Sequence, residues 1–212
     1  IEDFDPVVRK VIFVPVALNY DRVLEDTILI AAGKAGTRRF KPPFLNVLGR
    51  FLRHVALRVT RRFRGFGTAS VSFGDPLELS VFRQNISGDL TEAVATELMQ
   101  RIADVTPVLG VPLVSRHLLA HPKIDLATLQ DLVEASVNDL GALKIPLPRR
   151  SAEEVAQDAV NRMKARKLVV ETSQGLEVTD LGQSILTFYA NSIDHHFAAL
   201  AKVDVKNAAI AE

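Results

Sequence analysis

The sequence contains no cysteine among its 212 residues. This absence excludes a disulfide framework and a thiolate metal site, and it fits a reducing compartment. No apolar run approaches the ~20 residues that a helix needs to cross a bilayer, and the first residues show no secretory signal pattern. The net charge is only +1, so the chain as a whole has no excess of positive charge for binding a polyanion.

The sequence also lacks the motifs of several common active sites. It contains neither a glycine-rich phosphate-binding loop nor a Gly-x-Ser-x-Gly turn. Its five histidines are His54, His117, His121, His195 and His196. Pro122 lies between His121 and Asp125 and spoils their pairing, and the two adjacent histidines have no third ligand nearby, whereas zinc takes three or four. We therefore expect no catalytic residue, no metal site and no cofactor in this chain.

A candidate site follows an apolar run near the start of the chain. The β-branched, apolar residues 11–16 predict a strand over 11–18 that is buried on both faces. Pro15 suits a strand end or edge, because proline cannot donate to a ladder. Ligands bind beyond the carboxyl ends of strands in open α/β sheets, although an ordinary solvated turn would show the same pattern. The polar residues in question are Asn19, Tyr20, Asp21 and Arg22.

The clearest predicted helix runs from Phe44 to Phe63, with apolar residues at spacings of three and four on one face. Basic residues occupy most of the other side, and no acidic residue lies between Arg38 and Arg64. A one-sided basic helix suits an anionic lipid surface or a phosphate group, and a solvated arginine face is the alternative. The candidate contacts are Arg38, Arg39, Arg50, Arg53, Arg58 and Arg61.

The rest of the chain predicts a second strand and then helices. Residues 68–73 alternate apolar and polar side chains, and a strand, a long crossover and a second strand together predict an α/β sheet. The pattern is helical after Pro76, which divides the chain into an α/β part at 1–80 and a helical domain at 81–212. The expected helices are 92–105 with Thr91 as N-cap, 114–120, 125–140, 151–166 with a Ser151–Glu154 capping box, and one from Thr179 to about Leu200, with a hairpin across 168–178.

The segment from 151 onwards offers a second kind of function. A helix, a hairpin and a further helix resemble a winged helix, in which the helix before the hairpin would enter a DNA groove. Glu153, Glu154 and Asp158 share that helix and would repel phosphate, so we do not expect a nucleic acid as partner. The candidate contacts of this alternative are Asn161, Arg162, Lys164, Arg166 and Lys167.

Several stretches, in order, resemble one enzyme family. Residues 11–16, Val-Ile-Phe-Val-Pro-Val, resemble the fourth conserved block of the glycerolipid acyltransferases. The chain then looks like the bacterial glycerol-3-phosphate acyltransferases: 19–25 is similar to their Gly-Tyr-Glu-x-Val-x-Glu, and the match continues through 36–41. Residues 67–76 resemble their Gly-x-Val-x-Val-x-Phe-Gly-Glu-Pro, and 188–195 their Tyr-Tyr-x-Asn-x-Ile-x-His. The order and spacing of these motifs are together fairly specific.

The resemblance implies the C-terminal strands of an acyltransferase α/β domain, followed by an all-helical tail with a small winged-helix-like hairpin. The implied reaction moves a fatty acyl group from acyl-CoA or acyl carrier protein to glycerol-3-phosphate in phospholipid biosynthesis. The family's His-x-x-x-x-Asp pair, which supplies the general base and the residue that orients it, is absent here, as is its Phe-x-Glu-Gly-x-Arg block. Both would lie upstream of Ile1, and the chain alone would be inactive.

The resemblance also implies roles for particular residues. Val14, Pro15, Val16 and Tyr20 would line the floor of the acceptor or acyl-donor site without performing the chemistry. The basic helix would hold the protein peripherally on an anionic membrane, at the cytoplasmic face, although Pro42-Pro43-Phe44 replaces acidic residues that the family carries near it. Another glycerolipid acyltransferase, acting on lysophosphatidate or dihydroxyacetone phosphate, shares these blocks and is the alternative within the family.

Overall fold

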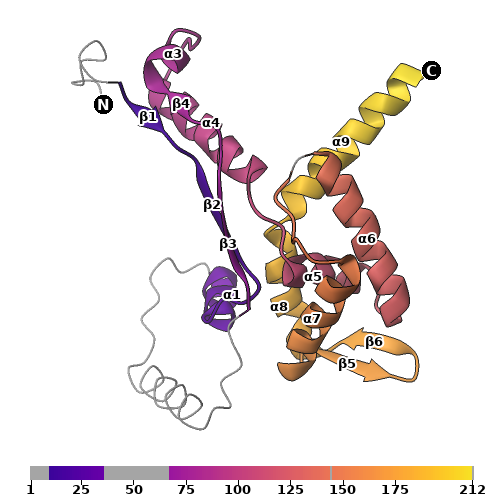
Figure 1. Cartoon of the computed structure of the whole chain (residues 1–212). Coiled ribbons are helices and arrows are strands. Elements are labelled where there is room, and N and C mark those ends of the chain that lie inside the picture. The colour runs from indigo at the N-terminus through magenta and orange to yellow at the C-terminus, as the bar shows by residue number, and fades with distance from the viewer. Residues whose placement is uncertain (1–9, 36–66, 144, 212) are drawn as a thin grey trace, which may run out of the picture.

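The computed structural model describes residues 10–35, 67–143 and 145–211, which form a long β-ribbon beside a group of C-terminal helices (Figure 1). The predicted basic helix at 44–63 lies outside the described residues. So do all six of its candidate contacts, which are Arg38, Arg39, Arg50, Arg53, Arg58 and Arg61.

The ribbon is built from two long-range strand pairs that run antiparallel. Strand β2 (Val16–Tyr20) pairs with β3 (Ala69–Phe73), and β1 (Ile12–Phe13) pairs with β4 (Leu77–Glu78). The bond from Gly74 N–H to the Pro15 carbonyl, 2.9 Å, joins the two pairs into one ribbon. Pro15 therefore lies between strands, where no N–H is needed. Because the strands are antiparallel, they do not form the parallel βαβ unit that is common in α/β sheets.

The prediction of a strand buried on both faces is wrong for β2. Its side chains alternate between buried and exposed, with Ala17 and Asn19 buried and Val16, Leu18 and Tyr20 exposed. The physical reason is that the described ribbon has only two strands and packs one of its faces against the helices. Every second side chain of this apolar run is therefore exposed, which the sequence pattern alone does not reveal.

The buried core lies among the C-terminal helices, with α5 (Gly110–Ala120) at its centre. Helices α6 (Leu126–Ala142), α7 (Ala152–Ala165) and α8 (Asp180–Asn191) pack around α5 (Figure 1). Helix α1 (Asp26–Ala35) packs against α8, and Ile30 on this helix and Val23 just before it pack against the same core. The fully buried side chains include Leu113, Val114, Leu118, Leu129, Val133, Met163, Leu186 and Ile193.

Most of the predicted helices are confirmed, with differences at their ends. Helix α5 begins four residues earlier than expected, because Pro112 falls in the first turn, where its missing N–H needs no partner. The N-cap of α4 (Leu90–Asp104) is Asp89 rather than Thr91. Ser151 caps α7 and Thr179 caps α8, as predicted. The remaining short helix is α3 (Leu79–Arg83).

The expected last helix is in fact two helices. Helix α8 ends at Asn191 and α9 (Asp194–Ala211) begins at Asp194. The hydroxyl of Ser192 donates to the Tyr189 carbonyl at 2.7 Å, and Ser192 N–H bonds to the same carbonyl. These local bonds compete with the regular helical pattern, and the break buries Ile193 completely.

The predicted hairpin is confirmed as β5 (Val169–Thr172) and β6 (Gly175–Val178). Ile124, which lies between α5 and α6, forms an additional bridge to Leu176 on β6. Gly175 has φ +117, and a Cβ there would lie 2.6 Å from the Ile124 carbonyl oxygen. Glycine is therefore required at the point where the hairpin meets this bridge.

We predict that Gly182→Ala destabilises the protein by about 2 kcal/mol or more. A Cβ at position 182 would lie 2.1 Å from the Leu168 carbonyl oxygen, so the backbone would have to shift. Gly33→Ala is the matched control, because a Cβ there meets nothing within 4 Å and should stabilise α1 by up to ~1 kcal/mol. Urea unfolding measures both. Equal unfolding midpoints for Gly182→Ala and the wild type would contradict the close contact.

Candidate functional site

The candidate site is the end of β2, where alternate side chains face in opposite directions. Asn19 and Asp21 point toward the helices and are buried, at 7% and 5% exposure, whereas Leu18 and Tyr20 are exposed at 54% and 41%. This alternation follows from the period of two along a strand. The polar cluster singled out in the sequence is therefore split between an inner junction and an outer surface.

Asn19 joins the strand to two places in the helical part of the chain. Its side-chain N–H₂ donates to the Pro107 carbonyl at 2.8 Å and to the Ser192 hydroxyl at 3.3 Å. Its side-chain oxygen accepts from the N–H of Tyr20 at 2.8 Å. Both ends of the buried amide are thus satisfied, as burial requires.

Asp21 serves as the N-terminal cap of a helix that lies far away in sequence. Helix α5 has Leu109 at its N-cap position, and this side chain offers no hydrogen bond. One carboxylate oxygen of Asp21 accepts from Val111 N–H at 3.0 Å, and the other accepts from Thr68 N–H at 3.1 Å. The negative charge therefore lies at the positive end of α5, where it is favoured.

A second buried carboxylate, Asp26, begins α1 at 2% exposure. One of its oxygens accepts from the hydroxyl of Tyr189 at 2.8 Å and from Arg166 at 2.5 Å. The Tyr189 oxygen in turn accepts from Val23 N–H at 2.9 Å. Asp26, Arg166, Tyr189 and Val23 thus connect the turn after β2 to α7 and α8, and we call them the strand-end lock.

The protonation states in the lock follow from its surroundings. Burial alone would lower the pKa of Arg166, but its hydrogen bond and charge interaction with Asp26 outweigh burial and raise the pKa above its ordinary value. Burial raises the pKa of Tyr189. Arg166 is therefore cationic and Tyr189 protonated at neutral pH, so the tyrosine O–H donates to Asp26. With every partner in place, the arrangement orients backbone and side chains rather than transferring a proton.

The residues predicted to line a substrate site are not all on one side. Val14, Val16 and Tyr20 are exposed, whereas Pro15 is buried. Val16 stands opposite Phe73, and Leu18 opposite Val71, in the ribbon register. These exposed apolar side chains, Val16, Leu18, Tyr20, Val71 and Phe73, share one side of the β2–β3 pair, and we call this side the ribbon face.

Comparison with known proteins identifies the family. A family model described as the C-terminal region of glycerol-3-phosphate acyltransferase matches residues 55–205. The chain belongs to this family. The matched range contains Arg166, Tyr189 and the helix that Asp21 caps.

Relatives with the name glycerol-3-phosphate acyltransferase match most of the chain. The protein from Pseudoalteromonas atlantica is 29% identical over 90% of this chain, and that from Aeromonas hydrophila is 28% identical over 90%. The Shewanella pealeana protein is 25% identical over 88%. The chain spans about a quarter of the length of these curated relatives, since the match covers 25% of each.

Three of the described histidines, His117, His195 and His196, make structural hydrogen bonds. The rings of His195 and His196 bond through Nε2 to the carbonyls of Ala103, at 2.9 Å, and Thr106, at 2.8 Å, and so attach α9 to the end of α4 and the segment that follows it. His117 lies 3.0 Å from the Ser136 hydroxyl. Within the ranges that the structure describes, no group of three or more His, Cys, Asp or Glu residues could hold a metal ion.

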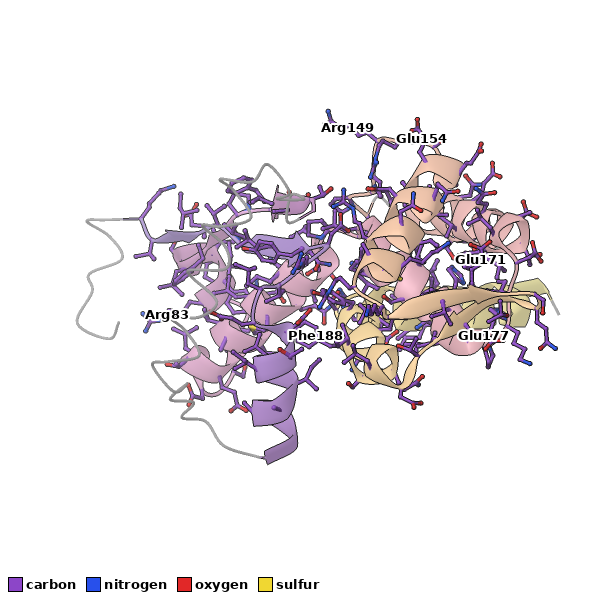
Figure 2. The ribbon with its side chains drawn as sticks, turned by 90° about the horizontal axis from the view of Figure 1, so that it is seen from below. Arg83, Arg149, Glu154, Glu171, Glu177 and Phe188 are labelled. Carbon is purple, nitrogen blue, oxygen red and sulfur yellow. The ribbon has the colours of Figure 1, made fainter. Side chains whose placement is uncertain are left out.

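Two of the cations proposed for DNA contact pair with nearby acids on the same surface. Arg162 bonds to Asp158 at 3.0 Å, and Lys164 pairs with Glu171 on the hairpin. A third, Arg166, turns inward to Asp26. Figure 2 shows Glu154, Glu171 and Glu177 on the outside of this part of the molecule. The acids reduce the positive charge that a DNA-binding helix would need.

Among the described helices, none combines the length and the apolar character needed to cross a membrane.

The sequence patterns drew attention to Asn19 and Asp21 but missed three members of the lock. Asp26 looks like an ordinary helix-start acid and Arg166 like a surface cation, and each is separated from its partner by 140 positions. Tyr189 lies within the 188–195 motif, which gives it no role. The motif thus pointed to residue 189, but only the hydrogen bond of Tyr189 to Asp26 shows what this tyrosine does.

We predict that Asp21→Ala costs about 2 kcal/mol of stability, because it removes the cap of α5 and leaves the buried Val111 N–H and the partly buried Thr68 N–H without an acceptor. Asp21→Asn is the control, since one side-chain oxygen is kept and the loss should be roughly half as large. Thermal and urea unfolding measure both variants. If alanine and asparagine behave alike, the carboxylate is not the cap.

We also predict that the protein loses stability between pH 6.5 and 4. Burial, and then the charges of Arg116 and His121, lower the pKa of His117 from 6.5 to about 4. In this window the unfolded chain binds a proton that the folded chain does not, so stability falls as the pH falls. Burial also lowers the pKa of His196, which adds to the same trend.

His117→Gln tests this origin of the pH dependence. Glutamine can still bond to Ser136 but cannot take up the proton. The loss of folding stability between pH 7 and 5 should therefore be smaller in the variant by about 1–2 kcal/mol, after allowance for solvent screening. Urea unfolding at pH 7, 6 and 5 isolates the histidines, because the carboxylates whose pKa is lowered, such as Asp158, titrate at lower pH. Parallel curves for variant and wild type would contradict the assignment.

Proposed function

We propose that this chain is the C-terminal portion of a glycerol-3-phosphate O-acyltransferase. The complete enzyme would transfer a fatty acyl group from acyl-CoA or acyl carrier protein to a hydroxyl of glycerol-3-phosphate, as a step of phospholipid biosynthesis. The observation that carries the proposal is the family match over residues 55–205. The three relatives, which match about nine-tenths of the chain, support it.

The ribbon face supports a place for this chain within a larger acyltransferase α/β domain. The described ribbon has two strands, which is fewer than an independently stable sheet needs. Phe73 is 70% exposed beside other apolar side chains, and such a surface is unusual unless something covers it. Further strands and helices of the complete enzyme would cover it, and Val14, Pro15, Val16 and Tyr20 would lie at the floor of the substrate site.

The chain supplies no general base for the reaction. None of the five histidines has an aspartate five positions on, so the His-x-x-x-x-Asp pair of the family must come from elsewhere in the enzyme. Helices α5, α6 and α7 with the β5–β6 hairpin follow the order of a winged helix, and the bridge at Ile124 would be its short first strand. In this proposal the winged-helix-like unit is a scaffold rather than a reader of DNA.

The basic segment gives the proposed enzyme a way to reach its lipid product. Arg38, Arg39, Arg50, Arg53, Arg58 and Arg61 lie in a stretch without acidic residues. Each such cation near an anionic membrane contributes ~1 kcal/mol of attraction. The enzyme would therefore be peripheral, at the cytoplasmic face of the membrane, with binding that weakens as salt is added.

The proposed function is tested by grafting this chain into a relative. We replace the matching region of the Aeromonas hydrophila protein with residues 1–212 and measure acyl transfer from palmitoyl-CoA to glycerol-3-phosphate. The graft should be active, whereas the chain alone and the relative without the region should not be. Turnover by the purified chain alone, or a folded graft without turnover, would contradict the proposal.

A further inference from the structure

The strand-end lock places a buried ion pair where the ribbon turns into α1. The Asp26 side chain is 3% exposed and that of Arg166 is 20% exposed. The Asp26 carboxylate is hydrogen-bonded within the protein, by Arg166 and Tyr189 on one oxygen and by Thr27 N–H on the other at 2.7 Å. Both oxygens of this carboxylate accept hydrogen bonds from the protein and the side chain is buried, so we treat the lock as structural rather than as a binding site.

The lock determines the path of the chain directly after the ribbon face. Tyr20 is the last residue of β2, and Val23 N–H is held by the Tyr189 oxygen three residues later. Asn19 and Asp21 hold the other side of the same turn through Pro107 and Val111. The exposed side chain of Tyr20 therefore lies between two groups of bonds that reach into the helices. Figure 2 places Phe188, the neighbour of Tyr189, at the boundary between ribbon and helices.

A buried ion pair is a poor source of stability, because desolvation offsets most of the attraction between the charges. Well-packed apolar residues of similar volume often hold two elements together at least as firmly. The bonds of an ion pair are directional, however, and they define one arrangement of the joined elements. An ion pair can therefore fix the position of the joined elements even where it adds little to the stability of the fold.

We propose that Asp26, Arg166 and Tyr189 are positioning residues for the acyl transfer reaction. They hold the turn at 21–25 so that Tyr20 and the ribbon face keep one position relative to the rest of the active site. This inference rests on the proposed function for its catalytic consequence. Its structural part, the holding of the turn by α7 and α8, stands on the contacts of this chain alone.

The decisive variant replaces the ion pair with apolar residues of similar size, Asp26→Leu together with Arg166→Met. Packing between α1 and the helices is kept, and no buried charge is left without a partner. The Tyr189 hydroxyl loses its acceptor, so we expect a moderately lower unfolding midpoint, with the protein still folded. Lys164→Met with Glu171→Leu is the control, because it removes an exposed ion pair between the same helix α7 and the β5–β6 hairpin.

The first measurement is amide hydrogen exchange in the 212-residue chain. In the Asp26→Leu/Arg166→Met variant we expect exchange of residues 21–25 to accelerate about tenfold, the equivalent of one lost hydrogen bond. Tyr189→Phe, which removes a single oxygen atom and its bond to Val23 N–H, should accelerate exchange at Val23 by a similar factor. The control should match the wild type. Unchanged exchange in both lock variants would overturn the structural part of the proposal.

The second measurement is turnover by the graft described above. If the ribbon face shifts in the Asp26→Leu/Arg166→Met variant, the reacting groups are less well aligned in the transition state. We therefore expect kcat of this variant to fall at least about tenfold, with little change in KM. Arg166→Lys, which keeps the charge, should recover part of the activity. Full activity of the apolar variant, with exchange accelerated, would show that the lock does not position the reaction. An inactive wild-type graft would instead refute the proposed function and leave the exchange result to decide the structural part.

Discussion

A carboxylate buried as deeply as Asp26, at 2% exposure, must have its charge balanced within the fold. The partners that balance it are Arg166 at the end of α7 and Tyr189 on α8. This requirement brings together the turn after β2, the start of α1 and two C-terminal helices. Asp21 and Asn19 add bonds to α5 and to the segments beside it. The direction of the ribbon relative to the helical core depends on these few polar contacts.

Strand β2 connects two different surfaces because its side chains alternate. On the inner side, Asn19 is buried and hydrogen-bonded, and Asp21 follows it at the strand end. On the outer side, Val16, Leu18 and Tyr20 face away from the helices. The inner polar residues hold β2 against the helices, and this contact sets the position of the outer apolar side chains relative to the helical core. In the proposed function, this division would let the outer residues of β2 contribute to an active site that other parts of the enzyme complete.

Several titratable groups of the described helices make structural contacts. His195 and His196 hold α9 through main-chain carbonyls, and His117 is kept neutral by burial near Ser136. Two of the cations on α7 are paired with acids, Arg162 with Asp158 and Lys164 with Glu171. These contacts favour a supporting role for the C-terminal helices over an independent catalytic or DNA-binding role.

The sequence by itself determined most of the C-terminal helices, the caps Ser151 and Thr179, and the hairpin, because these depend on periodicity and on short-range bonds such as Ser151 to Glu154. It also singled out Asn19 and Asp21. The division of the chain at residue 80 stays a prediction, although α1 packs on the core beyond it. Only the tertiary structure decided that β2 is exposed on one side and that Asp26 meets Arg166 and Tyr189. Partners 140 and 163 positions apart leave no local pattern, since their energies arise from burial that exists only after folding.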